Sequence, residues 1–124
     1  MVEWVKAMND AVLAFMIEKK SAVDNLEEIL SVKGVDMVQF GPSDYSVSIG
    51  KPGQGSLPEV VEAHHKMIKM AIKMGVRPRV EINGPEDAKP YLDMGVRDFC
   101  MGWDNQIIAQ WCRTNGPAMR KLLS

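Results

Sequence analysis

The sequence has little cysteine, no long hydrophobic run and almost no net charge, and each shortage excludes a class of function. Fifteen lysine and arginine residues face 16 acidic residues, a formal net charge of −1, which argues against nucleic acid or an anionic membrane surface as a partner. The longest apolar run, residues 11–17, is far shorter than the roughly 18 residues that span a bilayer. The first ten residues carry charges where a signal peptide needs an apolar core.

The two cysteines, Cys100 and Cys112, lack a metal-type spacing. We interpret them as buried, reduced thiols, which favours a cytoplasmic location. A chain of 124 residues is long enough to form a hydrophobic core. Because no linker or low-complexity segment divides it, we expect residues 1–124 to form a single domain.

One local pattern occurs three times. The pairs Gly34-Val35, Gly75-Val76 and Gly95-Val96 each follow a helical pattern and precede a short apolar run. Glycine adopts the left-handed conformation that closes a helix, after which the chain can turn directly into a strand. The repetition therefore predicts helix-to-strand units.

Apolar periodicity and capping residues place the expected elements. We predict a helix near 21–30 capped by Ser21, and a second over 56–74 with Ser56 and Glu59 as a capping box. A third helix is expected from 83 to 94, distorted by Pro90. A fourth is expected to be capped by Asp104 and to break at Gly116-Pro117. Strands are expected at 11–18, 35–41, 78–82 and 97–103, and residues 2–9 as the tail of a preceding helix. Short apolar strands between helices indicate a parallel α/β sheet. Four strands make half of a barrel or a small open sheet, since a complete (β/α)8 barrel takes about 250 residues.

In parallel α/β folds the chemistry lies at the carboxyl ends of the strands. Glu18 ends the first expected strand, and Gly41-Pro42-Ser43-Asp44 follows the second. Neighbouring strands lie about 4.8 Å apart, so these two carboxylates can share one hard divalent cation. The alternative is a solvated strand end and a simple helix cap. Gly41 permits a tight exit from the strand, and the following amides, including that of Tyr45, would open a helical turn that faces an anion.

A known family matches this arrangement. Residues 16–54, MIEKKSAVDNLEEILSVKGVDMVQFGPSDYSVSIGKPGQ, resemble the HpcH/HpaI aldolases, as do the PEV segment at 58–60 and the strand ending in Gly102–Asp104. The resemblance implies the C-terminal half of a (β/α)8 TIM barrel. It implies that Glu18 and Asp44 bind Mg²⁺, Mn²⁺ or Co²⁺, and that Gly41, Pro42, Ser43 and Asp44 bind the substrate. The implied reaction is retro-aldol cleavage of a 4-hydroxy-2-oxo acid to pyruvate plus an aldehyde.

The departures from the family pattern are equally informative. No residue corresponds to the family's histidine base or to the arginine that stabilises the enolate, so no catalytic base is identified and it is expected from the missing half. Met16 stands where glutamine is usual, and Glu81 where an apolar residue is usual. His64 and His65 lie on a helix that should face away from the strand ends, so we assign them structural roles.

Four parallel strands would leave two open sheet edges. The expected partners are therefore a 2-oxo acid and either further copies of the chain or a separate N-terminal half-barrel. The alternative is a truncated, non-catalytic half-barrel that binds a partner chain or a small carboxylate.

Overall fold

The computed structural model describes residues 2–124, and its centre is one four-stranded sheet. The strands are β1 (Ala14–Ile17), β2 (Met37–Phe40), β3 (Arg77–Ile82) and β4 (Asp98–Met101). They lie in the order β1-β2-β3-β4, and every neighbouring pair is parallel. The predicted parallel sheet with alternating helices is confirmed.

Helices connect and flank these strands. They are α1 (Val2–Asn9), α2 (Lys20–Asp24), α3 (Leu26–Leu30), α4 (Pro42–Ser48), α5 (Pro58–Lys73), the 3₁₀ turn η1 (Pro85–Asp87), α6 (Lys89–Asp93) and α7 (Asp104–Leu123). The three Gly-Val junctions behave as predicted, since Gly34, Gly75 and Gly95 have φ angles of 90°, 77° and 99°. A left-handed glycine therefore precedes each of the last three strands.

The predicted helix starts were wrong. The N-cap residues of α2, α5 and α7 are Lys19, Leu57 and Trp103, and none has a side-chain capping bond, so Ser21, Ser56 and Asp104 are not caps. In α5 the reason is Pro58, whose fixed φ suits the first helical position. Asp104 is instead the first residue of α7.

Prolines divide the helices differently from the prediction. The segment 83–94 splits into η1 and α6, which puts Pro90 in the first turn of α6, where no backbone donor is needed. The predicted break at Gly116-Pro117 is wrong, because α7 continues through Pro117 to Leu123. Because α7 is solvent-exposed, water can bind the carbonyl that Pro117 leaves without a donor.

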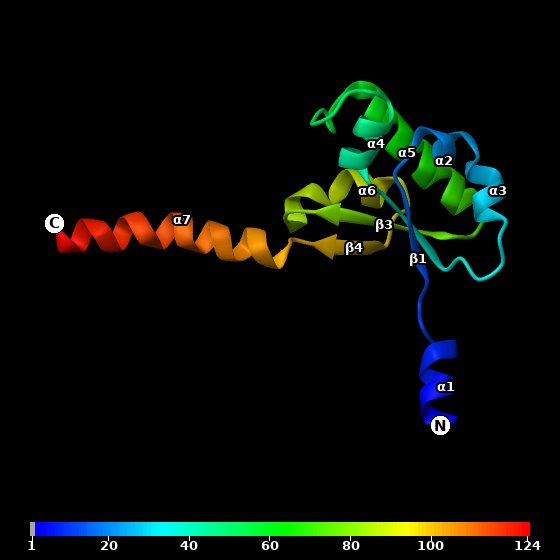
Figure 1. Cartoon of the computed structure of the whole chain (residues 1–124), viewed down its shortest axis with the longest axis horizontal. Helices are drawn as coiled ribbons and strands as arrows, with labels where there is room; N and C mark the ends of the chain where they lie inside the picture. The colour runs from blue at the N-terminus through cyan, green and yellow to red at the C-terminus, as the bar shows by residue number, and fades with distance from the viewer. Residues whose placement is uncertain (1) are drawn as a thin grey trace.

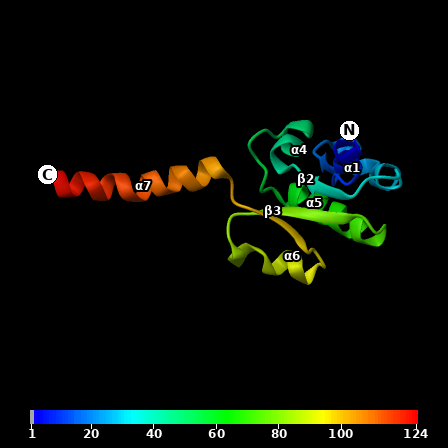
Figure 2. The same cartoon turned by 90° about the horizontal axis from the view of Figure 1, so that it is seen from below.

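The hydrophobic core lies between the sheet and helices α2, α3 and α5. Helix α5 contacts β2, β3, α3 and α4, and Figures 1 and 2 show it against the sheet. The largest fully buried apolar side chains come from the sheet, from α3 and α5, and from the segment before β4: Leu26, Val38, Val60, Met67, Ile68, Val80 and Val96. This packing fixes the ends of β1 and β2, where the acidic residues lie.

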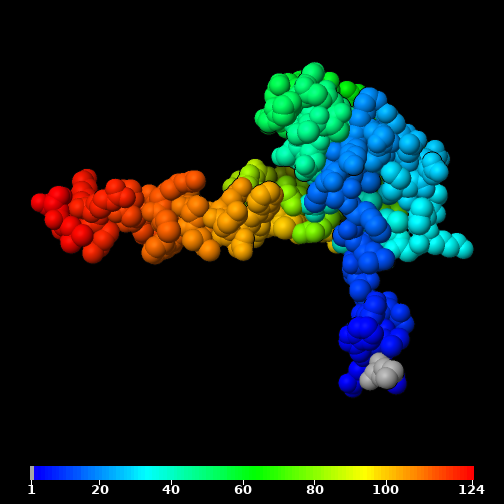
Figure 3. Space-filling model, in the orientation of Figure 1, coloured from blue at the N-terminus to red at the C-terminus, as the bar shows by residue number. Residues whose placement is uncertain are grey.

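Both terminal helices extend away from this body. Figures 1 and 3 show α1 and α7 projecting from the sheet in different directions, and neither has a buried residue. Trp4 and Trp111 are 67% and 66% exposed.

Both cysteines are free, but Cys112 on α7 is exposed and Cys100 only half-buried, so the prediction that they are buried was wrong. Within residues 2–124 no helix combines the length and apolarity needed to cross a membrane.

Candidate functional site

Glu18 lies directly beyond strand β1, beside the end of β2. Ile17 and Phe40 are register partners, and the Gly41 N–H donates to the Ile17 carbonyl at 3.0 Å. Glu18 therefore stands opposite Gly41, and its side chain is partly buried. The structure thus brings the predicted acidic residue against the first residue of the Gly-Pro-Ser-Asp segment.

Gly41 provides space for Glu18. A Cβ added at Gly41 would lie 3.0 Å from the Glu18 Cβ, 3.4 Å from its Oε2 and 3.2 Å from the Met16 Sδ. The φ of Gly41 is −104°, which any residue can adopt. The exit from the strand is tight, as expected, since Gly41 alone separates β2 from α4, but it does not require the backbone freedom of glycine. The lack of a side chain leaves room for the side chains of Glu18 and Met16.

Helix α4 carries the rest of the predicted site. Pro42 begins the helix and Asp44 lies in its first turn, where a carboxylate is favoured by the helix dipole. Ser43 and Asp44 are exposed. The Tyr45 amide donates to the Gly41 carbonyl at 2.9 Å, so it does not face an anion as predicted. The amides of Ser43 and Asp44 are the candidates that remain.

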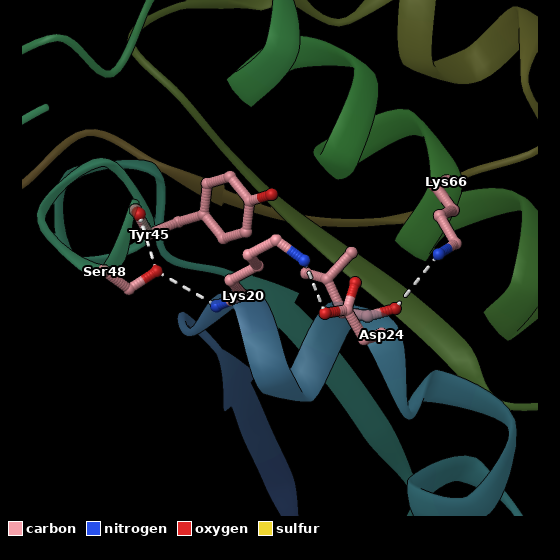
Figure 4. Close-up of polar contacts among 6 residues, drawn as sticks. Lys20, Asp24, Tyr45, Ser48 and Lys66 are labelled. Atoms are coloured by element: carbon pink, nitrogen blue, oxygen red, sulfur yellow. Dashed lines mark hydrogen bonds and ion pairs between the residues drawn. The ribbon is translucent and has the colours of Figure 1, made fainter. Parts of the chain in front are cut away.

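A polar bridge ties the segment after Glu18 to helix α4. The Lys20 N–H donates to the Ser48 Oγ at 2.9 Å, and the Ser48 hydroxyl donates to the Tyr45 carbonyl at 2.7 Å. Figure 4 shows Ser48 between these two partners. Sequence reasoning missed Ser48, because nothing local marks a contact between residues 28 positions apart.

A second polar pair lies on neighbouring strands. Gln39 is 4% exposed, and its Nε2 donates to the Glu81 Oε1 at 2.6 Å. The Gln39 Oε1 is buried and has no hydrogen-bond partner among the described residues. Gln39 is the register partner of Met16 on β1, so its side chain lies on the same face of the sheet as that of Met16. One feature of the sequence could have indicated this pair: Gln39 is the single polar residue in the otherwise apolar strand MVQF.

His64 on α5 adjoins a cavity that reaches the strand ends. Its ring stacks on Phe40, with centroids 5.0 Å apart, and its buried Nε2 lacks a partner within the described chain. Burial, with a smaller effect from His65, lowers the pKa of His64 to about 4. The cavity, of about 360 Å³, is also lined by Asn83 and Trp103. The expectation that this part of α5 faces wholly away from the strand ends is therefore corrected.

The donor set of the candidate site consists of two carboxylates, Glu18 and Asp44. Carboxylate oxygens suit hard divalent cations such as Mg²⁺ and Mn²⁺, and one Glu18 oxygen, Oε2, lies beside the open position at Gly41. No cluster of three or more histidine, cysteine, aspartate or glutamate side chains occurs within residues 2–124. These residues therefore fit a cation whose other ligands come from water or substrate.

Comparison with protein families and curated sequences gives consistent results. The family described as HpcH/HpaI aldolase/citrate lyase matches residues 3–108. The 4-hydroxy-2-oxo-heptane-1,7-dioate aldolase of Escherichia coli is 34% identical over 105 residues, covering 85% of this chain and 40% of that protein. The same-named protein of Klebsiella pneumoniae is 33% identical over 109 residues, covering 87% and 41%. The chain thus spans about two fifths of these relatives.

Solved structures share the fold. Citrate synthase SbnG superimposes with a TM-score of 0.86 at 22% identity, over 98% of this chain and 50% of that one. The HpcH/HpaI aldolase from Desulfitobacterium hafniense superimposes with a TM-score of 0.82 at 27% identity, over 96% of this chain and 47% of that one. The four parallel strands therefore correspond to about half of a TIM-barrel-like chain.

Proposed function

Because the chain belongs to the HpcH/HpaI aldolase/citrate lyase family, we propose that it is the metal-binding half of a carbon–carbon lyase. The reaction is retro-aldol cleavage of a 4-hydroxy-2-oxo acid to pyruvate and an aldehyde. The observation that supports this most is the position of Glu18 beside Gly41 at the ends of β1 and β2, with Asp44 in the first turn of α4.

In this proposal Glu18 and Asp44 hold a divalent cation, Mg²⁺, Mn²⁺ or Co²⁺. When bound, the cation supplies a Lewis acid that stabilises the enolate formed as the carbon–carbon bond breaks. Glu18 contributes a partly buried carboxylate and Asp44 an exposed one. The fit rests on these oxygen donors and on the space that Gly41 leaves for Glu18.

The substrate carboxylate would bind at the start of α4. The amides of Ser43 and Asp44 are the donors in this proposal, while Gly41 and Pro42 set the path of the backbone. The Tyr45 amide is excluded, since it already donates to the Gly41 carbonyl. The relatives named 4-hydroxy-2-oxo-heptane-1,7-dioate aldolase support a 2-oxo acid as the substrate class.

The catalytic base is assigned to another chain or to a missing half. His64 is unsuited to this role, since its ring is stacked on Phe40 and burial lowers its pKa to about 4. We propose that the half-barrel is completed by association, with a further copy or with a separate N-terminal half. Exposed apolar side chains on both terminal helices, including Trp4, Trp111 and Leu122, favour this. The two unpaired thiols favour a cytoplasmic setting.

A coupled assay for pyruvate tests the activity. The protein is incubated with 4-hydroxy-2-oxo acids and Mn²⁺, and release is compared between wild type and Glu18→Ala. We expect Mn²⁺-dependent release that the substitution abolishes. No release at any Mn²⁺ concentration would oppose the proposal and favour a non-catalytic half-barrel that binds a partner chain or a small carboxylate.

A further inference from the structure

Ser48 joins two segments that each carry one of the proposed metal ligands. Lys20, whose amide donates to the Ser48 Oγ at 2.9 Å, is two residues beyond Glu18. Tyr45, whose carbonyl accepts the Ser48 hydroxyl at 2.7 Å, directly follows Asp44. One hydroxyl group therefore spans the segments on both sides of the site (Figure 4).

The start of α2 depends on this bond. The first amides of a helix have no partner within the helix, and the N-cap residue of α2, Lys19, provides no side-chain capping bond. The Lys20 amide, the first of α2, takes its acceptor from Ser48 on another helix. Ser48 thus caps α2 from outside and fixes where the chain turns after Glu18.

The other contacts of α2 do not replace this bond. Lys20 Nζ pairs with Asp24 at 2.6 Å, but this pair lies within α2 and is exposed. Lys66 Nζ donates to the Val23 carbonyl at 3.2 Å and holds α2 against α5. Neither contact reaches α4, where Asp44 lies.

We propose that Ser48 is a positioning residue for the Glu18–Asp44 pair. It acts through the backbone of Lys20 and Tyr45 and touches neither the ion nor the substrate. The inference rests on the proposed function, since it assigns Ser48 a role in holding the two metal ligands in place.

Mn²⁺ binding, followed by the electron paramagnetic resonance of the free ion, tests this without an activity assay. The variants are Ser48→Ala, Ser48→Thr, which keeps the hydroxyl, and Ser31→Ala. Ser31 is the matched control, because its hydroxyl likewise donates to the carbonyl three residues earlier, that of Glu28, at 2.7 Å. Residues that orient metal ligands typically change affinity 10–100-fold, so we expect Ser48→Ala to weaken Mn²⁺ binding about tenfold, while the other two variants bind as wild type does.

Amide hydrogen exchange by NMR supplies a second readout. Exchange at Lys20 should be slow in wild type and Ser48→Thr and fast in Ser48→Ala, while far-UV circular dichroism stays unchanged. Unaltered Mn²⁺ affinity in Ser48→Ala, despite rapid exchange at Lys20, would overturn this inference alone. Absence of Mn²⁺ binding in wild type would overturn the proposed metal site and this inference with it. If Ser48→Ala loses its fold, Ser48→Thr decides: affinity near wild type supports the role, and a tenfold loss opposes it.

Discussion

Gly41 and Glu18 meet where strands β1 and β2 end, and a Cβ on Gly41 would lie 3.0 Å from the Glu18 Cβ. The Gly41 amide also donates to the carbonyl of Ile17, the residue before Glu18. The backbone that positions Glu18 is therefore held at the same point where its side chain needs space. The effect of substituting Gly41 can therefore be predicted.

Gly41→Ala should displace the Glu18 carboxylate with little effect on the fold, because the φ of −104° suits alanine. We expect Mn²⁺ affinity to fall by about tenfold, the scale on which ligand orientation acts. The measurement is a Mn²⁺ titration alongside circular dichroism. Gly55→Ala is the control, since its nearest contact, the Pro42 Cβ, is at an ordinary 3.5 Å. Equal affinities in the two variants would contradict this role of Gly41.

The bond between Gln39 and Glu81 should contribute to stability. Glu81→Ala removes the acceptor of the Gln39 Nε2, so the free energy of unfolding should fall by about 1 kcal/mol. Gln39→Leu removes both that donor and the unpartnered Oε1, so it should cost less or stabilise. Urea unfolding measures the free energy of unfolding of both variants, with Glu27→Ala, a substitution at an exposed position, as the reference. A larger loss for Gln39→Leu than for Glu81→Ala would refute this account.

The depressed pKa of His64 predicts a loss of stability in acid. Burial and the neighbouring His65 lower its pKa from 6.5 to about 4, so the unfolded chain binds a proton that the folded chain rejects. The contribution of neutral His64 to the free energy of unfolding is fully present above pH 6.5. It is lost as the pH falls to about 4, and the total loss is about 3 kcal/mol. His64→Phe, which keeps a ring against Phe40, should lose this component.

Urea unfolding of wild type and His64→Phe between pH 7 and pH 4 tests that prediction. The difference between the two proteins isolates His64 from carboxylates that titrate in the same range. Identical pH dependence in both would show that His64 accepts a proton freely in the folded state.

Association through α7 predicts a change in mass on substitution. Trp111 is 66% exposed on a helix without buried residues, so Trp111→Asp should weaken self-association and leave the sheet folded. Size-exclusion chromatography with light scattering gives the mass, and Gln110→Asp on the same exposed helix is the control. A well-folded wild-type monomer would rule out completion by a second copy.

Local signals in the sequence were sufficient for the architecture. The Gly-Val junctions predicted where helices turn into strands, because a left-handed glycine is a requirement of the backbone itself. Glu18 and the segment 41–44 were predicted to lie together because consecutive parallel strands end at the same edge of the sheet. Both inferences depend on neighbours in sequence or on adjacent strands.

The failed helix starts and the missed contacts have different causes. Ser56 resembles a capping residue, but Pro58, only two residues further on, starts the helix. The bonds of Lys20 to Ser48 and of Gln39 to Glu81 join residues 28 and 42 positions apart. No periodicity or motif encodes such pairs, because the packing of whole helices and strands decides them.

Mn²⁺ binding by the Glu18–Asp44 pair is the central claim, and isothermal titration calorimetry tests it most directly. Wild type should bind one Mn²⁺ per chain, Glu18→Ala and Asp44→Ala should each lose that site, and Asp24→Ala should retain it, because Asp24 pairs with Lys20. No binding by wild type, or full binding by both Glu18→Ala and Asp44→Ala, would contradict the account.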